Sequence, residues 1–160
     1  MESGSKDYMR LEIPSLSRNE SFARAVIAAF AARLDPTLEE ISDIKTAVSE
    51  AVTNAVIHAY ENEIGPIIFY ACIENSDLIV EITDQGQGIP DLEKVKQPFY
   101  TSKPEMERSG MGFTIMESFM DELTVITGQE EGTTVRMVKK ISAKSSKGDA
   151  INGGQNGVSD

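Results

Sequence analysis

The chain has 160 residues, enough for one domain with a buried core. Its formal net charge of −11 at pH 7 disfavours a nucleic-acid-binding surface, although a nucleotide could still bind through a metal ion, backbone amides and local cations. No apolar run approaches the length of a membrane span, no secretion leader is recognisable and Cys72 is the only cysteine, so we expect a cytoplasmic protein with no disulfide and no nucleic-acid or membrane partner.

The first residues indicate a short lead followed by a strand. Residues 1–7 have the composition of a flexible lead. Apolar and polar residues alternate over residues 8–13, which predicts a half-buried strand. Pro14 should end this strand, because proline cannot donate a hydrogen bond to a neighbouring strand.

A first helix is predicted from about residue 18 to residue 34. Ser17 and Glu20 have the spacing of a capping box, in which two side chains satisfy free backbone N–H groups at a helix start. Glu20 and Arg24 lie four residues apart, where they could form a surface ion pair of little energetic value or contact a partner. The predicted core stripe consists of Phe22, Val26, Ala29 and Phe30.

A second, longer helix should begin at another capping box, formed by Thr37 and Glu40. Within it, Glu50 and Asn54 are four residues apart and therefore lie one above the other, on a face different from the core stripe. The predicted core stripe consists of Ile41, Ile44, Val48, Ala51, Val52, Ala55 and Ala59.

Two hairpins and a short helix complete the pattern. The first hairpin joins strands at about residues 67–74 and 78–83 through a turn of Asn, Ser and Asp. A buried helix is predicted over residues 111–120, followed by a hairpin with strands at residues 123–127 and 133–141.

This order of elements predicts an α+β fold. We expect a two-layer sandwich, in which helices cover one face of a mostly antiparallel mixed sheet. The domain should span residues 8–141. The Ser, Lys, Gly and Asn content of residues 142–160 predicts a disordered tail, because such a composition cannot form a core.

Two segments carry residues suited to nucleotide chemistry. Glu50 can accept a proton, and the amide oxygen of Asn54 can bind a hard cation. Asp84 follows a predicted strand and could accept a hydrogen bond from an exocyclic amine such as that of adenine, while Gly86 and Gly88 would let the backbone approach a flat ring. By themselves, both patterns are also typical of a solvated helix face and an ordinary turn.

A third segment, residues 97–110, shows no clean periodicity, and loops of this length inside a compact domain are usually functional or mobile. Lys103 and Arg108 could neutralise phosphate charge there, although single side chains of this kind are more often only solvated. Gly110 and Gly112 would open the next helix, whose free N–H groups suit phosphate oxygens.

In this order, the three segments resemble the GHKL superfamily of ATPases and kinases, which includes gyrase, heat-shock chaperones, mismatch-repair ATPases and sensor histidine kinases. The runs SEAVTNAVIHAY at 49–60, DQGQGIPD at 84–91 and YTSKPEMERSGMGFTIMESFMDE at 100–122 resemble more closely the anti-sigma serine kinases of Gram-positive spore formers. The last run is most similar to the sporulation sigma-F branch, whereas Ala59 is also familiar from the stress-response sigma-B branch. The resemblance covers about residues 8–141 and implies the Bergerat ATP-binding fold of that superfamily.

The resemblance implies a role for each matching position. Glu50 would be the catalytic base, Asn54 the magnesium ligand, and Asp84 the residue that reads adenine. Together with Asn54 and Asp84, the positions expected to contact ATP are Gly86, Gly88, Thr101, Ser102, Lys103, Arg108, Gly110, Met111, Gly112 and Thr133.

The activity implied is that of a protein serine kinase dependent on ATP and Mg²⁺, which also binds and inhibits a sigma-F-type sporulation sigma factor. Its substrate would be the anti-sigma antagonist, a small STAS-domain protein, and the kinase would act as a homodimer. Glu20 and Arg24 would contact these partners.

Three other interpretations remain open at the level of sequence. A sigma-B-type stress-response kinase would share most of the same residues. A detached ATP domain of a histidine kinase is disfavoured, because His58 is the only histidine and lies inside the predicted nucleotide helix. A non-catalytic, nucleotide-gated module that binds a sigma factor is opposed weakly by the presence of Glu50.

Overall fold

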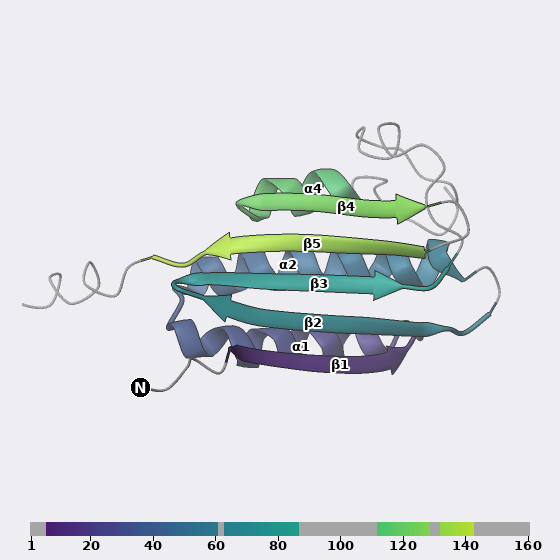
Figure 1. Cartoon of the computed structure of the whole chain (residues 1–160), viewed down its shortest axis with the longest axis horizontal. Helices are drawn as coiled ribbons and strands as arrows, with labels where there is room; N and C mark the ends of the chain where they lie inside the picture. Colours follow the sequence, from purple (N-terminus) through teal and green to yellow (C-terminus); the bar gives the residue numbers. More distant parts are fainter. Residues whose placement is uncertain (1–5, 61–62, 87–111, 129–131, 143–160) are drawn as a thin grey trace, which may run out of the picture.

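A computed structural model describes residues 6–60, 63–86, 112–128 and 132–142. Its described strands form one five-stranded sheet in the order β1-β2-β3-β5-β4, and each neighbouring pair is antiparallel. The helices lie against one face of this sheet (Figure 1). The α+β two-layer prediction is therefore confirmed, although the described strands contain no parallel pair that would make the sheet mixed.

Both predicted hairpins are present. In the first hairpin, Asn75 and Ser76 alone separate the strands, and Asn75 adopts the left-handed conformation (φ 56°) that asparagine tolerates in tight turns. The two remaining pairings, β1 with β2 and β3 with β5, join segments that are far apart in the sequence. The strands are β1 (Asp7–Pro14), β2 (Pro66–Glu74), β3 (Asp77–Asp84), β4 (Glu122–Gly128) and β5 (Gly132–Lys140).

Three α-helices are described, and two of them end in a turn of different geometry. The first, α1 (Asn19–Ala31), continues into the 3₁₀ turn η1 (Ala32–Leu34). The second, α2 (Leu38–Asn54), continues into the π-helical turn η2 (Ala55–Ala59). The third, α4 (Gly112–Phe119), packs on α2 and precedes β4.

Only one of the two predicted capping boxes forms. At the start of α2, the Glu40 N–H donates to Thr37 Oγ1 (3.1 Å) and the Thr37 N–H donates to Glu40 Oε1 (2.8 Å), as predicted. The Ser17 and Glu20 capping box is wrong, because no side chain caps α1. The Glu20 carboxylate instead accepts a hydrogen bond from Thr53 Oγ1 of α2 (2.9 Å).

The core stripe is correct for α2 and mostly wrong for α1. In α2 and η2 the residues Ile44, Val48, Ala51, Val52 and Ala55 are buried, whereas Ile41 and Ala59 are only partly buried. In α1, Phe30 is buried as predicted, but half of Phe22 is exposed, Ala29 is exposed and Val26 is only partly buried; Ala23, Ile27 and Ala31 complete the buried stripe instead.

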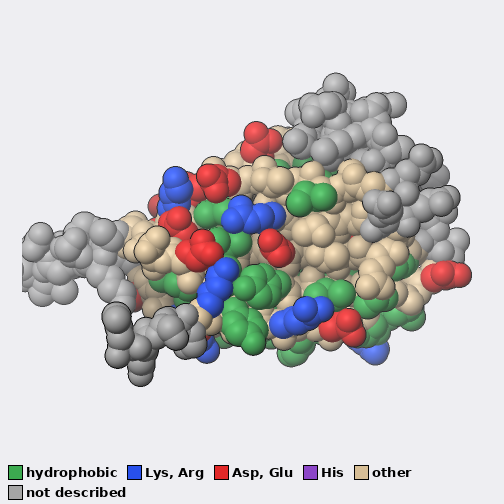
Figure 2. Space-filling view, in the orientation of Figure 1, with side chains coloured by type: hydrophobic (Ala, Val, Ile, Leu, Met, Phe, Trp, Pro, Cys, Tyr) green, Lys and Arg blue, Asp and Glu red, His purple; other side chains and the backbone are tan. Residues whose placement is uncertain are grey.

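A smaller buried cluster lies on the other face of the sheet. Cys72, Ile79 and Val138 occupy neighbouring positions on β2, β3 and β5 and are shielded in part by Tyr70. Cys72 is therefore a small apolar residue of a strand. Figure 2 shows this face, on which hydrophobic side chains are interspersed with charged ones. No helix in the described ranges is long and apolar enough to cross a membrane.

Candidate nucleotide site

Four segment ends meet at one end of the sheet. They are the C-terminal end of α2 with η2, the C-terminal end of β3, the start of α4 and the start of β5 (Figure 1). The predicted residues Asn54, Asp84, Gly112 and Thr133 lie at or next to these ends. The fold thus gathers residues that are up to 79 positions apart in the sequence.

Glu50 and Asn54 occupy the last two turns of α2, and both side chains are partly buried. Their spacing of four residues within a continuous helix places them on one face, as predicted. The helix changes to π geometry directly after Asn54. Single π-helical turns are rare in proteins, and those that exist are frequently found at functional sites. The turn η2 is therefore a further indication of a functional site at this end of the sheet.

The carboxamide of Asn54 lies directly against the first residue of α4. A methyl group placed on Gly112 would lie 3.1 Å from both Nδ2 and Oδ1 of Asn54. A larger side chain at position 112 would therefore displace the carboxamide or the start of the helix. Glycine here allows the two groups predicted to serve the phosphates and the metal to lie side by side.

Asp84 is a nearly buried carboxylate at the end of β3. It is paired with Thr133 of β5 in the sheet, and only 9% of it is exposed. The Gly86 N–H donates to Asp84 Oδ1 (2.9 Å), and the backbone N–H of Thr133 also donates to this carboxylate. Burial raises the pKa of Asp84, and the two N–H donors offset part of that effect.

Two glycines are required by backbone contacts around Asp84. A methyl group on Gly86 would lie 2.2 Å from the carbonyl oxygen of Ala59, at the end of η2. A methyl group on Gly132 would lie 2.2 Å from the carbonyl oxygen of Asp84, and Gly132 also has a positive φ of 82°. The turn after β3 therefore fits between the end of η2 and the start of β5 with no room for a side chain at either glycine.

Threonine hydroxyls line the strand ends beside Asp84. The hydroxyls of Thr127 and Thr133 are hydrogen-bonded (3.0 Å), as are those of Thr83 and Thr134 (2.9 Å). Of these four residues, our sequence analysis identified only Thr133. The cross-strand pairing of β3 with β5 creates the second pair, and no local pattern in the sequence indicates that pairing.

Glu20 and Arg24 are both hydrogen-bonded to α2. Arg24 Nη1 donates to Ser49 Oγ (3.2 Å), just as Thr53 Oγ1 donates to Glu20 Oε2. Over the described residues no ion pair joins Glu20 to Arg24, so the simple surface pair is not formed. Ser49 and Thr53 directly precede Glu50 and Asn54 in the sequence, so the predicted partner residues contact the same part of α2 that carries two residues of the predicted site.

Seven predicted site residues lie outside the described ranges, and the structure says nothing about them. They are Gly88, Thr101, Ser102, Lys103, Arg108, Gly110 and Met111. For the metal, the described residues contain no group of three His, Cys, Asp or Glu side chains that could hold an ion by themselves. Asn54 is the described residue whose amide oxygen suits Mg²⁺, provided that phosphate oxygens complete the coordination.

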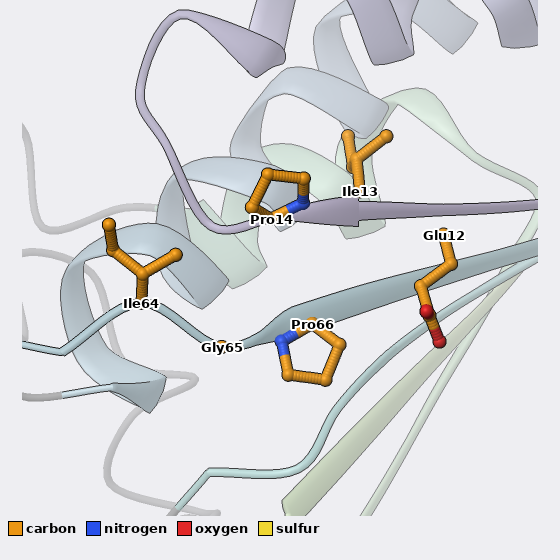
Figure 3. Close-up of a pocket in the computed structure, with 6 residues that line it drawn as sticks. All are labelled: Glu12, Ile13, Pro14, Ile64, Gly65 and Pro66. Carbon is orange, nitrogen blue, oxygen red and sulfur yellow. The ribbon is translucent and has the colours of Figure 1, made fainter.

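A shallow hollow of about 280 Å³ lies near the same end of the sheet, between β1 and the chain that enters β2 (Figure 3). It is lined by Glu12, Ile13, Pro14, Ile64, Gly65 and Pro66. None of these residues belongs to the predicted site, and Glu12 is the only charged side chain among them. This hollow is therefore distinct from the candidate nucleotide site.

The sequence profile of the histidine kinase-like ATPase domain matches residues 13–139. Among solved structures, the catalytic domain of the histidine kinase ThkA has the same fold, with a TM-score of 0.54 and 17% sequence identity, over 83% of this chain and 96% of that one. At this identity the likeness concerns the fold alone.

Several curated relatives are much more similar in sequence. The anti-sigma F factor of Caldanaerobacter subterraneus subsp. tengcongensis is 59% identical over 83% of this chain and 93% of its own length. Anti-sigma F factors of Clostridium botulinum and Bacillus licheniformis are 58% and 52% identical, over 84% and 86% of this chain and 94% of each relative.

Proposed function

The chain belongs to the anti-sigma F factors and carries their histidine kinase-like ATPase domain, and from this premise we propose that it is a protein serine kinase that also silences a sporulation sigma factor. The kinase would use ATP with Mg²⁺ and phosphorylate the anti-sigma antagonist, a small STAS-domain protein. It would act as a homodimer in the cytoplasm, through a domain spanning residues 8–141.

One observation carries the proposal: the fold brings Asn54, Gly112 and the buried Asp84 to one end of the sheet. The Asn54 carboxamide lies against the start of α4, while Asp84 is set deeper, beside Thr133. An amide oxygen near the N-terminal end of a helix suits phosphates and a cation, and a buried acceptor suits an exocyclic amine. These two chemistries are the ones that a purine nucleotide requires.

Each residue then has a separate chemical task. Glu50 accepts the proton of the attacking serine hydroxyl, and Asp84 accepts a hydrogen bond from the adenine amine. Asn54 holds Mg²⁺, which when bound offsets charge on the phosphates. The family resemblance implies that further residues contact the nucleotide, most of them in a lid over the phosphates: Gly88, Thr101, Ser102, Lys103, Arg108, Gly110 and Met111.

Phosphorylation of the antagonist would explain how one protein can both hold and release a sigma factor. If sigma factor and antagonist share the surface near Glu20 and Arg24, only one of them can bind at a time. An antagonist that carries a phosphate would no longer displace the sigma factor, so kinase activity would keep the sigma factor bound.

A sigma-B-type partner is the second candidate, and Ala59 is the residue that favours it. The stress-response branch resembles this chain at that position. The same purified protein can be titrated with a sigma factor of each type, and tighter binding of the sigma-B type would replace the first assignment.

Incubation with γ-labelled ATP, Mg²⁺ and the candidate antagonist tests the proposed chemistry. We expect label on a serine of the antagonist. Label on histidine of the kinase would instead indicate histidine kinase chemistry. ATP-dependent sigma-factor binding without any label would indicate a non-catalytic module.

A further inference from the structure

Tyr60 joins three segments around the candidate site through one hydroxyl group. Tyr60 comes directly after η2 and lies six positions after Asn54 in the sequence. Its hydroxyl donates to the carbonyl oxygen of Pro66 (2.6 Å), where β2 begins, and accepts a hydrogen bond from the backbone N–H of Gln85 (2.7 Å), in the turn after β3. Both bonds have the length of good hydrogen bonds, so the single hydroxyl connects the helix end, β2 and this turn.

The Pro66 side of this connection is firmly held. A methyl group on Gly65 would lie 2.3 Å from the nearest atom of the Tyr60 ring, so glycine is needed for the ring to pass. Gly65 is fixed in turn by the buried Ser15, because Ser15 Oγ accepts from the Gly65 N–H (3.0 Å) and the Ser15 N–H donates to the Gly65 carbonyl (2.9 Å). Figure 3 shows Gly65 and Pro66 entering β2 beside Pro14 of β1.

The other side of the connection is the turn that carries Asp84. Gln85 stands between Asp84, whose carboxylate is predicted to read adenine, and Gly86, whose N–H donates to that carboxylate. Gly86 packs on the carbonyl of Ala59, the residue before Tyr60. The Tyr60 hydroxyl thus holds the middle of this turn through the Gln85 N–H, while Gly86 is held by the Asp84 carboxylate and by its contact with Ala59.

Protonation of Tyr60 is compatible with this double role. Burial raises the pKa of the Tyr60 hydroxyl, the N–H of Gln85 acts in the opposite direction, and the nearby Asp84 carboxylate adds to the rise. The hydroxyl therefore keeps its proton at neutral pH and can donate to Pro66 while it accepts from Gln85.

We propose that Tyr60 is a positioning residue for base recognition: it fixes the turn after β3 so that the Asp84 carboxylate points at the exocyclic amine of adenine. The inference rests on the proposed function, because it assumes that Asp84 reads the base. Hydrogen bonds weaken steeply when their geometry is distorted, so a small rotation of this turn would reduce selectivity for adenine before it reduced stability. A merely structural role for Tyr60 would change stability and leave base selectivity unchanged.

Tyr60→Phe tests this idea, because it keeps the ring that fills the space beside Gly65 and removes only the hydroxyl. Calorimetric titration of the full chain with Mg·ATP and with Mg·GTP gives both dissociation constants. We expect ATP affinity to fall roughly five- to tenfold, the size expected if the misplaced Asp84 carboxylate loses its one hydrogen bond to adenine, with a smaller change for GTP. Thr37→Ala is the matched control, since it removes a cap at the far end of α2 and should lower stability without altering the ATP-to-GTP ratio.

Asp84→Asn separates failure of the inference from failure of the proposed function. If Asp84→Asn lowers ATP affinity and selectivity while Tyr60→Phe leaves both at the wild-type value, the positioning role is wrong and base reading by Asp84 stands. If Asp84→Asn has no effect on ATP binding, both ideas are wrong.

Amide hydrogen exchange on the unmodified chain keeps the test decisive if Tyr60→Phe does not fold. We expect the Gln85 amide to be protected in the presence of Mg·ATP, since its hydrogen bond to Tyr60 should persist in the complex. Exchange of the Gln85 amide at the rate of an unprotected residue would overturn the proposal.

Discussion

The carboxyl group of Asp84 is buried in an environment that disfavours its ionisation. Since burial raises its folded pKa, ionisation opposes folding at pH values above that pKa, and the penalty is relieved as the pH falls towards the unfolded value of about 3.9. Asp84→Asn removes the penalty at every pH. The melting temperature of the variant, relative to that of the wild type, should therefore be higher at pH 7 than at pH 4.

Scanning calorimetry of both proteins across this range measures the difference directly. Asp84→Asn also alters the acceptor of the Gly86 and Thr133 N–H groups. An effect of this change that is the same at every pH cancels, because only the change of the melting-temperature difference with pH is compared. A difference in melting temperature that grows on acidification would show that the buried carboxylate is stabilised by its N–H donors more than it is penalised by burial.

Glu50 should matter for phosphotransfer much more than for binding. Glu50→Gln keeps the size of the side chain and removes the proton acceptor, so we expect the rate to fall by about 10²-fold or more while ATP still binds. Asn54→Ala should lose Mg²⁺-dependent nucleotide binding instead, which provides the contrast. Single-turnover phosphorylation of the antagonist measures the rate, and a wild-type rate in Glu50→Gln would remove Glu50 from the chemistry.

At the scale of elements, α1 and α2 are connected by the two side chains that we assign to partner binding. Arg24 donates to Ser49, and Glu20 accepts from Thr53, so both are oriented by α2. Phe22 lies between them in the sequence and is half exposed, which leaves an apolar ring on the same helix available to solvent. An exposed aromatic ring close to an arginine is a common composition for a binding hot spot.

Arg24→Ala should weaken binding of both sigma factor and antagonist by at least about tenfold, with melting temperature and ATP affinity preserved. Ser49→Ala is the matched control, because it removes the hydrogen-bond partner and leaves the guanidinium in place. Surface plasmon resonance with each partner in the presence of ATP measures the effect. Wild-type affinity for both partners in Arg24→Ala would contradict a shared surface, and loss of one alone would make Arg24 a contact of that partner.

Elements defined by local chemistry could be predicted from the sequence, and those defined by tertiary contacts could not. The Thr37 and Glu40 capping box, the Asn75 turn and the stripe of α2 depend on neighbours in the chain, and all three were predicted. The cap at Ser17 was wrong because the Glu20 carboxylate is taken by Thr53, 33 positions away.

The same distinction applies to the site. Glu50, Asn54 and Asp84 could be predicted as candidates because their motifs are local, and the structure places Asn54 and Asp84 at the same end of the sheet. The role that we propose for Tyr60 rests on two contacts, of Gly86 with Ala59 and of Gln85 with the Tyr60 hydroxyl. These contacts form only when β3 lies beside the end of the helix, so no local pattern could indicate them.

At the scale of the whole molecule, the last described residues, Ile141 and Ser142, are hydrogen-bonded to other parts of the domain. Ile141 is buried and donates its N–H to the Ser76 carbonyl (3.0 Å). Ser142 donates through its N–H (2.9 Å) and its hydroxyl (3.0 Å) to Glu40, whose pKa is lowered because these bonds and those from Thr37 outweigh the effect of burial.

A chain ended after Ser142 should keep its melting temperature and kinase activity nearly unchanged, because the composition of the remaining tail cannot form a core. A chain ended after Lys140 is the control. It loses the buried Ile141 side chain and the bonds to Glu40, so its melting temperature should fall by about 5 °C or more. A fall of that size in the longer chain would show that the tail packs on the domain.

The position of β5 has a consequence for how the protein is made. Among the described strands β5 is synthesised last, yet it lies between β3 and β4 in the sheet. Strands β1, β2 and β3 can pair as soon as residues 7–84 have emerged from the ribosome. The edge of β3 then stays unpaired until β5 has been synthesised. During that interval Asp84 lacks its donor from Thr133, and Gly132 is not yet in place. The growing chain can therefore pair three of its five described strands before the candidate nucleotide site is complete, and ATP bound at the proposed site would stabilise the protein only after β5 has joined the sheet.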